Sequence, residues 1–292
     1  MQQDIESLER WTTENNMQMN NEKFVLLSYN KNKEIDNSYN LRDGTIIKEE
    51  SHTKDLGVIM TNDGKFTNHI AQLVSNCKRT ISMIFRAFKT RNDQIMLALY
   101  KSLVLSKLDY CSVLWSPNNL SDLRKLEGLQ ANFTFRMACS KTEDGTKRDY
   151  WQRLNYLGLY SIQRRFERYT VIYVWKIRQG IVHNPGLEFK NTSPEGSRHG
   201  LMCVVPKGTS KLRENSFMVR GPKLFNSLPK DIREYQLDNE VRQQQSVDNF
   251  KRRLDEYLSL IPDEPSVRSD YTKYMTGITS YGEVTNSILR NI

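Results

Sequence analysis

The chain has 292 residues and a formal net charge of +9, from 43 Lys and Arg against 34 Asp and Glu. Its 38% hydrophobic content is low, but 10% aromatic residues can supply a buried core and argue against global disorder. No segment approaches the roughly 18 apolar residues of a membrane helix, and the start of the chain lacks the apolar core of a signal peptide. We therefore expect an intracellular protein of the nucleus or cytoplasm that is not secreted and binds no membrane.

Residues 1–65 have the pattern of a small α+β segment. Apolar residues at helical spacing predict a helix over 4–15, with Ile5, Leu8 and Trp11 on one face. The extended segments are short, and they are predicted at 24–29, at 39–47 around an Asp-Gly turn, and at 54–60. The polar residues 30–37 between the first two are predicted to form a loop.

From Thr67 onward the hydrophobic period becomes helical, and it predicts four helices, over 67–89, 93–106, 120–137 and 161–179. The first of them has an apolar stripe made of Ile70, Leu73, Val74, Cys77, Ile81, Ile84, Phe85 and Phe88. In the second, the residues expected to face the core are Ile95, Leu99, Tyr100 and Leu103. Ser161 is predicted to cap the fourth helix, and Gly180 to end it.

Residues 183–215 are rich in Pro, Gly, Ser and Asn and are predicted to be a linker or loop. A C-terminal region follows over 216–262, and its apolar spacing predicts a last helix over 246–259. The tail over 263–292 is polar and is expected to be disordered.

The expected fold class is therefore α+β and mostly helical. A small β-hairpin region at the N-terminus precedes a helical bundle and a C-terminal helical appendix.

The sequence contains no recognisable active site. Its four histidines and four cysteines are isolated, and no CxxC, HExxH, GxSxG or phosphate-binding glycine motif occurs. For His69 and Cys77, on one predicted helix, an exposed histidine and a structural cysteine are favoured over a metal or catalytic pair. An acidic cluster interleaved with Arg233 and Arg242 is favoured as a solvated surface over a metal site, and its members are Asp231, Glu234, Asp238 and Glu240. We expect no metal, no cofactor and no small-molecule substrate.

The positive charge is concentrated in the middle of the chain. Residues 71–180 carry a net charge of +11, against −4 for residues 1–70 and +2 for residues 181–292. Basic residues on the polar side of the first predicted helix can follow a phosphate backbone and release its counterions, and they are Lys78, Arg79, Arg86 and Lys89. Further basic residues lie on the fourth predicted helix, and they are Arg164, Arg165 and Arg168. A helical bundle with ordinary charged outer faces is the alternative, and charge alone leaves both open.

An ordered series of short motifs runs from residue 8 to about residue 258. The motifs are LERW at 8–11, MNNEKF and LLSY at 19–29, KDLGVIM and a following His-Ile at 54–70, LYKSLV, LDYC and LWSP at 99–117, LE and LQ at 126–130, LNYLGL at 154–159, and FMVRGPKLFNSLP with FKRRL at 217–254. Together they resemble the C-terminal part, comprising palm end, thumb and C-terminal region, of a non-LTR retrotransposon (LINE-type, jockey-like) reverse transcriptase. The order of the motifs carries the resemblance, because each one alone is only moderately specific.

The resemblance implies roles for individual residues. Lys23 falls at the position of the motif-D lysine, which helps to protonate the leaving pyrophosphate in related polymerases. Phe24 stands where the family has Thr, and a surface lysine without such a role is the alternative. Lys54 and Gly57 fall in the primer-grip-like hairpin, where a glycine lets the backbone approach the primer strand closely; an ordinary strand glycine is the alternative.

The resemblance also implies a palm remnant over 1–65 and a thumb-like helical domain over 66–182, whose basic residues would lie near template–primer phosphates. In this family palm aspartates, including those of a Tyr-x-Asp-Asp turn, hold two metal ions for catalysis, and this chain contains no Tyr-x-Asp-Asp. We therefore expect a fragment of an RNA-directed DNA polymerase that is inactive alone and binds RNA or an RNA–DNA duplex, the parent enzyme using Mg²⁺. Two alternatives stay open: a host-adopted module that binds nucleic acid or a protein, and a non-functional transposon relic.

Overall fold

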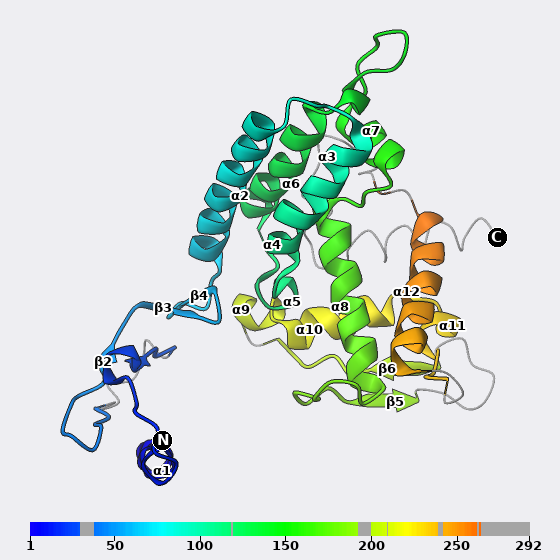
Figure 1. Ribbon diagram of the computed structural model, residues 1–292. Helices are drawn as coiled ribbons and strands as arrows, with labels where there is room; N and C mark the ends of the chain where they lie inside the picture. Colours follow the sequence, from blue (N-terminus) through cyan, green and yellow to red (C-terminus); the bar gives the residue numbers. More distant parts are fainter. Residues whose placement is uncertain are drawn as a thin grey trace. The chain divides into compact units, whose positions relative to one another are not determined.

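The computed structural model describes residues 1–29, 38–117, 119–191, 200–208, 210–238, 242–261 and 263. Within this part the protein is mostly helical with small two-stranded sheets (Figure 1), so the predicted α+β, mostly helical class is confirmed. The chain divides into two compact units, Met1–His69 and Ile70–Ile292. The predicted loop over 30–37 lies outside the described residues, as does the predicted disordered tail over 263–292 apart from its first residue. Asp263 is ordered, since its carboxylate accepts hydrogen bonds from the Ser161 N–H and hydroxyl.

Among its described residues, the first unit holds one α-helix and two small sheets. Its elements are helix α1 (Gln2–Glu14), the 3-10 turn η1 (Asn21–Lys23), strand β1 (Val25–Leu26) parallel to β2 (Lys48–Glu49), and strand β3 (His52–Asp55) antiparallel to β4 (Val58–Thr61). The predicted Asp-Gly turn is confirmed, because the Leu41 N–H donates to the Thr45 carbonyl across it at 2.9 Å. The strand predicted over 24–29 is shorter than expected, and only two of its residues pair.

The single strand predicted over 54–60 is wrong, because the chain turns back in the middle of it. Leu56 and Gly57 form the two-residue turn between β3 and β4, with φ of 43° and 89°. Positive φ at both central residues defines the type I′ turn, whose twist matches that of the flanking strands. The turn puts Lys54 and Gly57 in an exposed hairpin.

The second unit is built mainly of helices. Its first eight helical segments are α2 (Thr67–Ala87, which begins in the first unit), α3 (Asp93–Tyr100), the π-helical turn η2 (Lys101–Leu105), α4 (Ser106–Asp109), α5 (Ser112–Trp115), α6 (Leu120–Phe135), α7 (Tyr150–Leu157) and α8 (Ile162–Arg178), with the 3-10 turn η3 (Ala138–Ser140) before α7. The four helices predicted from Thr67 onward are confirmed. Ser161 caps α8, since its side chain accepts a hydrogen bond from the Arg164 N–H.

One helical face was predicted incorrectly. Ile95 is exposed, while Met96 and Tyr100 are fully buried. The helix over 93–106 is apolar on most sides, so hydrophobic spacing alone does not decide which row faces the core. Helix α7 was not predicted at all, although Asp149 and Gln152 form a capping box at its start, and this motif is readable in the sequence.

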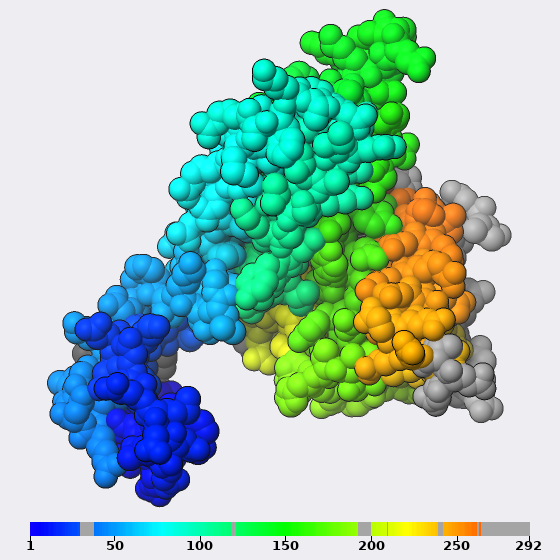
Figure 2. Space-filling view, in the orientation of Figure 1, coloured from blue at the N-terminus to red at the C-terminus, as the bar shows by residue number. Residues whose placement is uncertain are grey.

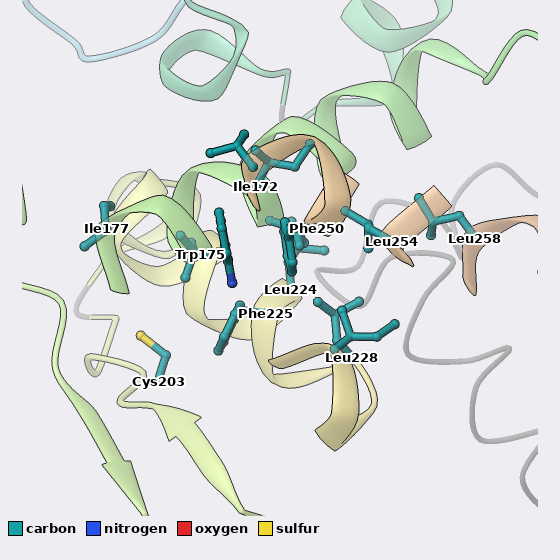
Figure 3. Close-up of a cluster of buried hydrophobic side chains, with 14 of the residues drawn as sticks. Ile172, Trp175, Ile177, Cys203, Leu224, Phe225, Leu228, Phe250, Leu254 and Leu258 are labelled. Atoms are coloured by element: carbon teal, nitrogen blue, oxygen red, sulfur yellow. The ribbon is translucent and has the colours of Figure 1, made fainter. Parts of the chain in front are cut away.

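The described segments that follow α8 pack against it. They contribute strands β5 (Phe189–Asn191) and β6 (Leu201–Cys203), which pair antiparallel, and helices α9 (Lys211–Glu214), α10 (Phe217–Asn226), α11 (Lys230–Arg233) and α12 (Gln243–Ser259). The rings of Trp175 on α8 and Phe250 on α12 stack 4.2 Å apart at 6°, within one cluster of buried side chains (Figure 3). Leu187 and Cys203 from the expected linker are buried in the same cluster. The regions expected over 66–182 and 216–262 therefore share a hydrophobic core.

Candidate nucleic-acid interface

Helix α2 separates an apolar face from a basic one. Most of the predicted stripe is buried, and the buried members are Ile70, Val74, Cys77, Ile81, Ile84 and Phe85. Phe88 was wrongly assigned to the stripe, because the helix ends at Ala87 and the Phe88 ring is exposed. The four basic residues predicted to contact nucleic acid are all exposed, and they are Lys78, Arg79, Arg86 and Lys89. The stripe positions fix the rotation of the helix, and this rotation turns the Lys78, Arg79 and Arg86 side chains to solvent. Lys89 follows the last residue of α2 and is exposed as well.

The basic face of α2 carries no compensating acidic residue from its own segment. Between Asp63 and Asp93 the sequence holds six basic residues and no Asp or Glu. Within the described part of the chain, Lys78, Arg86 and Lys89 form no ion pair, and Arg79 donates to the neutral Asn76 amide oxygen. An uncompensated row of cations attracts polyanions, and phosphate oxygens are its matching acceptors.

A further cation joins α2 from another part of the chain. The Lys107 ammonium on α4 donates to the Thr80 hydroxyl of α2 at 2.8 Å. This contact places a fifth exposed positive charge beside the helix. Sequence spacing gives no sign of it, because only packing of the helices brings Lys107 to α2.

Two of the predicted nucleic-acid ligands have a different role in the structure. The Arg164 side chain is only 2% exposed and donates to the Leu258 and Ile261 carbonyls at 3.2 and 2.6 Å. The Arg165 guanidinium lies against the Asp109 carboxylate, with both N–O distances under 3 Å. Both guanidiniums are thus engaged inside the protein, so we remove Arg164 and Arg165 from the candidate interface.

Arg168, the third basic residue predicted on this helix, is engaged in the same way. Its guanidinium donates to both oxygens of the Asp255 carboxylate, at 2.5 and 2.6 Å. We therefore remove Arg168 from the candidate interface as well.

The three predicted site residues of the first unit are all exposed. Lys23 ends η1 as an exposed side chain beside Phe24. Lys54 and Gly57 lie in the exposed β3–β4 hairpin. Within the described part of this unit, no hydrogen bond or ion pair connects Lys23 with Lys54 or Gly57.

The His69 and Cys77 side chains both have structural surroundings. His69 is buried and its Nδ1 accepts a hydrogen bond from the Ile59 N–H at 3.3 Å. Burial, assisted by the charge of Lys54, lowers the pKa of His69. Burial also raises the pKa of the Cys77 thiol to about 11, which keeps it protonated and unreactive. Cys77 is therefore structural, as the sequence indicated. The expectation of an exposed His69 is wrong, because this side chain is buried.

The acidic cluster near the C-terminus holds no candidate metal site in the described residues. Asp231 and Asp238 are exposed, and the Glu234 carboxylate accepts a hydrogen bond from the Leu201 N–H at 3.0 Å. Arg233, which lies between Asp231 and Glu234 in the sequence, is buried. Glu240 lies outside the described residues. No group of three or more potential metal ligands occurs in the described part of the chain.

A polar network inside the second unit has almost no signal in the sequence. The Tyr150 hydroxyl donates to the Glu127 carboxylate, which also accepts from the Gln163 N–H at 3.2 Å. The Gln130 side chain donates to the Tyr150 hydroxyl at 3.0 Å and accepts from the Tyr100 hydroxyl at 3.1 Å. Burial raises the pKa of Glu127 to about 7. The one sign of this network in the sequence is Gln130, a polar residue within the apolar row of α6.

A cavity of about 270 Å³ adjoins this network and is lined by Leu123, Arg124, Glu127, Gly128, Ala131 and Tyr150. Glu127 and Tyr150 at its wall bond to each other, and the network to which they belong joins α3, α6, α7 and α8. We therefore interpret the network as a structural element rather than as a reaction centre.

No protein-family model, no curated protein and no solved structure matches this chain. Among the helices of the described residues, none is both long and apolar enough to cross a membrane. Function must therefore be inferred from the residues and their geometry.

Proposed function

We propose that this chain is the palm-edge and thumb region of a non-LTR retrotransposon reverse transcriptase, and that it binds an RNA–DNA duplex through the basic face of α2. The observation that carries the proposal is the exposed, uncompensated row formed by Lys78, Arg79, Arg86 and Lys89. Each phosphate contact made by such a row releases counterions and favours binding without regard to base sequence.

The small first unit supports the same proposal. Its buried apolar side chains among the described residues are Leu41, Ile47 and Val58, while Leu8 and Trp11 on α1 stay exposed. So small a core is what a palm edge would have if its helix and strands packed on a larger sheet. The exposed β3–β4 hairpin lies at the position that the resemblance assigns to the primer grip.

Binding is tested by fluorescence anisotropy with a labelled RNA–DNA duplex at fixed low salt. The first variant changes Lys78, Arg79, Arg86 and Lys89 to Gln. The matched control changes an equal number of exposed lysines and arginines elsewhere in the second unit, and these are Lys211, Arg213, Lys223 and Arg252. Arg252 is a close match for Arg79, since it too contacts an asparagine three residues earlier.

The proposal requires the α2 variant to bind at least about tenfold more weakly than the control, because four phosphate contacts contribute a large part of non-specific affinity. Equal affinities for the two variants would contradict it. A primer-extension assay with Mg²⁺ tests the second half of the proposal. We expect no synthesis by this chain, which holds no Tyr-x-Asp-Asp, and detectable extension of the primer would show that part to be wrong.

A further inference from the structure

Two arginine–aromatic stacks lie on one part of the bundle, the first at the ends of α2 and α6 and the second on α7. The Arg136 guanidinium carbon is 3.7 Å from the centroid of the Phe85 ring, and that of Arg91 is 4.9 Å from it. The second stack places Arg148 at 4.4 Å from the Tyr156 ring. Guanidinium–ring contacts at these distances are attractive and hold both groups in a fixed orientation.

The two stacks are joined by direct contacts. Phe135, next to Arg136 in the chain, has its ring centroid 5.7 Å from the guanidinium of the buried Arg153. Arg153 in turn donates to the Arg148 carbonyl at 2.7 Å. The Ala138 N–H donates to the Arg91 carbonyl at 3.0 Å, which fastens the segment after α6 to the segment after α2. Residues far apart in the sequence are thus brought close together. We call the exposed residues of this group the bundle-end surface, and they are Phe88, Phe135, Arg136, Lys141, Lys147 and Tyr156.

Aromatic rings on the bundle-end surface are open to solvent. Phe135 is 54% exposed and Tyr156 is 57% exposed, and Phe88 at the end of α2 is 40% exposed. Buried aromatic rings stabilise a core, but rings as exposed as these leave apolar faces in water. Exposed rings beside guanidiniums are the combination on which nucleic-acid bases stack.

Positive charge surrounds these rings. Arg86 and Lys89 lie at the end of α2, and Lys141 and Lys147 pair across a small hairpin that projects from the second unit (Figure 2). Two of the nearby carboxylates accept hydrogen bonds from backbone N–H groups. Asp93 accepts from the Cys139 N–H, and Asp149 caps α7 by accepting from the Gln152 N–H. The remaining Glu143 and Asp144 lie in the hairpin itself.

We propose that the bundle-end surface binds unpaired nucleotides, with bases on Phe135 and Tyr156 and phosphates on Arg136, Lys141 and Lys147. A duplex hides the faces of its bases in the stack, so only single-stranded nucleic acid can use both the rings and the cations. The inference rests on the proposed nucleic-acid binding, but it uses side chains that do not belong to the α2 row.

The test measures anisotropy of a labelled single-stranded 12-mer, as RNA and as DNA, and of a blunt RNA–DNA duplex, with the full chain. The variant is Phe135→Ala with Tyr156→Ala. Because base stacking on an aromatic side chain accounts for roughly tenfold or more in affinity per base, we expect single-strand affinity to fall by on the order of 10- to 100-fold. Duplex affinity is expected to stay within about twofold of the wild type.

Two controls keep the result interpretable. Tyr110→Ala removes another half-exposed aromatic ring of the second unit and should leave single-strand affinity unchanged. Phe135→Tyr with Tyr156→Phe keeps both rings and should retain binding, which excludes general unfolding as the cause of a loss. Wild-type single-strand affinity in the double alanine variant, or an equal loss in Tyr110→Ala, would overturn the inference.

The outcomes also separate this inference from the proposed function. If the α2 variant loses duplex affinity while the double alanine variant keeps single-strand affinity, the bundle-end inference is wrong and the proposed function stands. If instead the α2 variant keeps duplex affinity while the double alanine variant loses single-strand affinity, the proposed duplex binding by α2 is wrong. The inference of single-strand binding by the bundle-end surface then stands. Comparison of the RNA and DNA strands shows which unpaired nucleic acid is preferred, since only RNA offers a 2′-hydroxyl.

Discussion

Arg165 on α8 and Asp109 on α4 form a two-point ion pair, with Nε 2.7 Å from Oδ1 and Nη2 2.6 Å from Oδ2. Tyr169 completes the arrangement, since its hydroxyl donates to Asp109 at 3.1 Å and accepts from Arg165 at 2.9 Å. Both charged side chains are 22% exposed. The pair joins helices that are 56 residues apart in the chain and so stabilises the bundle.

We expect Arg165→Ala to lower the free energy of unfolding by about 2 kcal/mol, because it leaves the partly buried Asp109 carboxylate without its guanidinium. Urea denaturation measures the change. Lys251→Ala is the control, since its pair with Asp248 lies within one helix, is more exposed than the Arg165 pair and should contribute less than about 0.5 kcal/mol. Duplex affinity should be unchanged in Arg165→Ala. A loss of affinity with normal stability would return Arg165 to the binding surface.

The pKa of Glu127 makes stability depend on pH. Its value in the folded protein is about 7, above the ordinary 4.5, because burial disfavours the charged carboxylate. Between these two values the folded state binds more protons than the unfolded state, so the free energy of unfolding falls as pH rises. The whole effect amounts to at most about 3 kcal/mol.

Glu127→Gln, which imitates the protonated acid, should therefore remove this part of the pH dependence. Urea denaturation of both proteins at pH 5 and pH 8 provides the measurement. We expect the variant to lose less stability than the wild type between the two pH values. Parallel pH profiles would show that Glu127 does not titrate as described.

The turn at Leu56 stores conformational strain. Leu56 has φ of 43° and is 82% exposed, so its side chain gains little by burial in return for a left-handed backbone. Leu56→Asn, which creates the favoured Asn-Gly type I′ turn, should stabilise the β3–β4 hairpin by about 1 kcal/mol. Native-state amide exchange of the hairpin should slow about fivefold. Leu56→Val should accelerate exchange, and slower exchange in the valine variant would contradict the turn geometry.

The four cysteines should differ sharply in reactivity. Cys111 is exposed, whereas Cys77, Cys139 and Cys203 are buried. Burial raises the pKa of the Cys139 thiol to about 11 and that of Cys203 to about 12, and Cys77 behaves likewise. An aromatic disulfide reagent at pH 8 should therefore label one thiol rapidly in the native protein and four in urea. Cys111→Ser should abolish the rapid phase, and a second rapid thiol would contradict the packing.

The sequence was most informative where periodicity and capping act locally. The α2 stripe from Ile70 to Ile84 sets the rotation of the helix, and the exposure of Lys78 and Arg86 follows from it. Ser161 as the N-cap of α8 is equally local, because the cap bonds within its own first turn.

The remaining features depend on contacts between distant segments. Arg165 could not be assigned from its charge, because Asp109 is brought to it only by the packing of α4 on α8. Ile95 was misplaced since apolar residues occupy several sides of its helix. The bundle-end surface was not predicted for the same reason, as Arg136 meets Phe85 only when α2 and α6 lie together.

The salt dependence of RNA–DNA duplex binding tests most directly the central claim that the α2 row contacts phosphates. The slope of log K against log salt concentration counts the phosphates neutralised, at roughly 0.7 to 0.9 per contact. We predict a slope about 3 smaller in magnitude when Lys78, Arg79, Arg86 and Lys89 are changed to Gln, and an unchanged slope in the control with Lys211, Arg213, Lys223 and Arg252 changed to Gln. Identical slopes in the wild type and the α2 variant would contradict the claim.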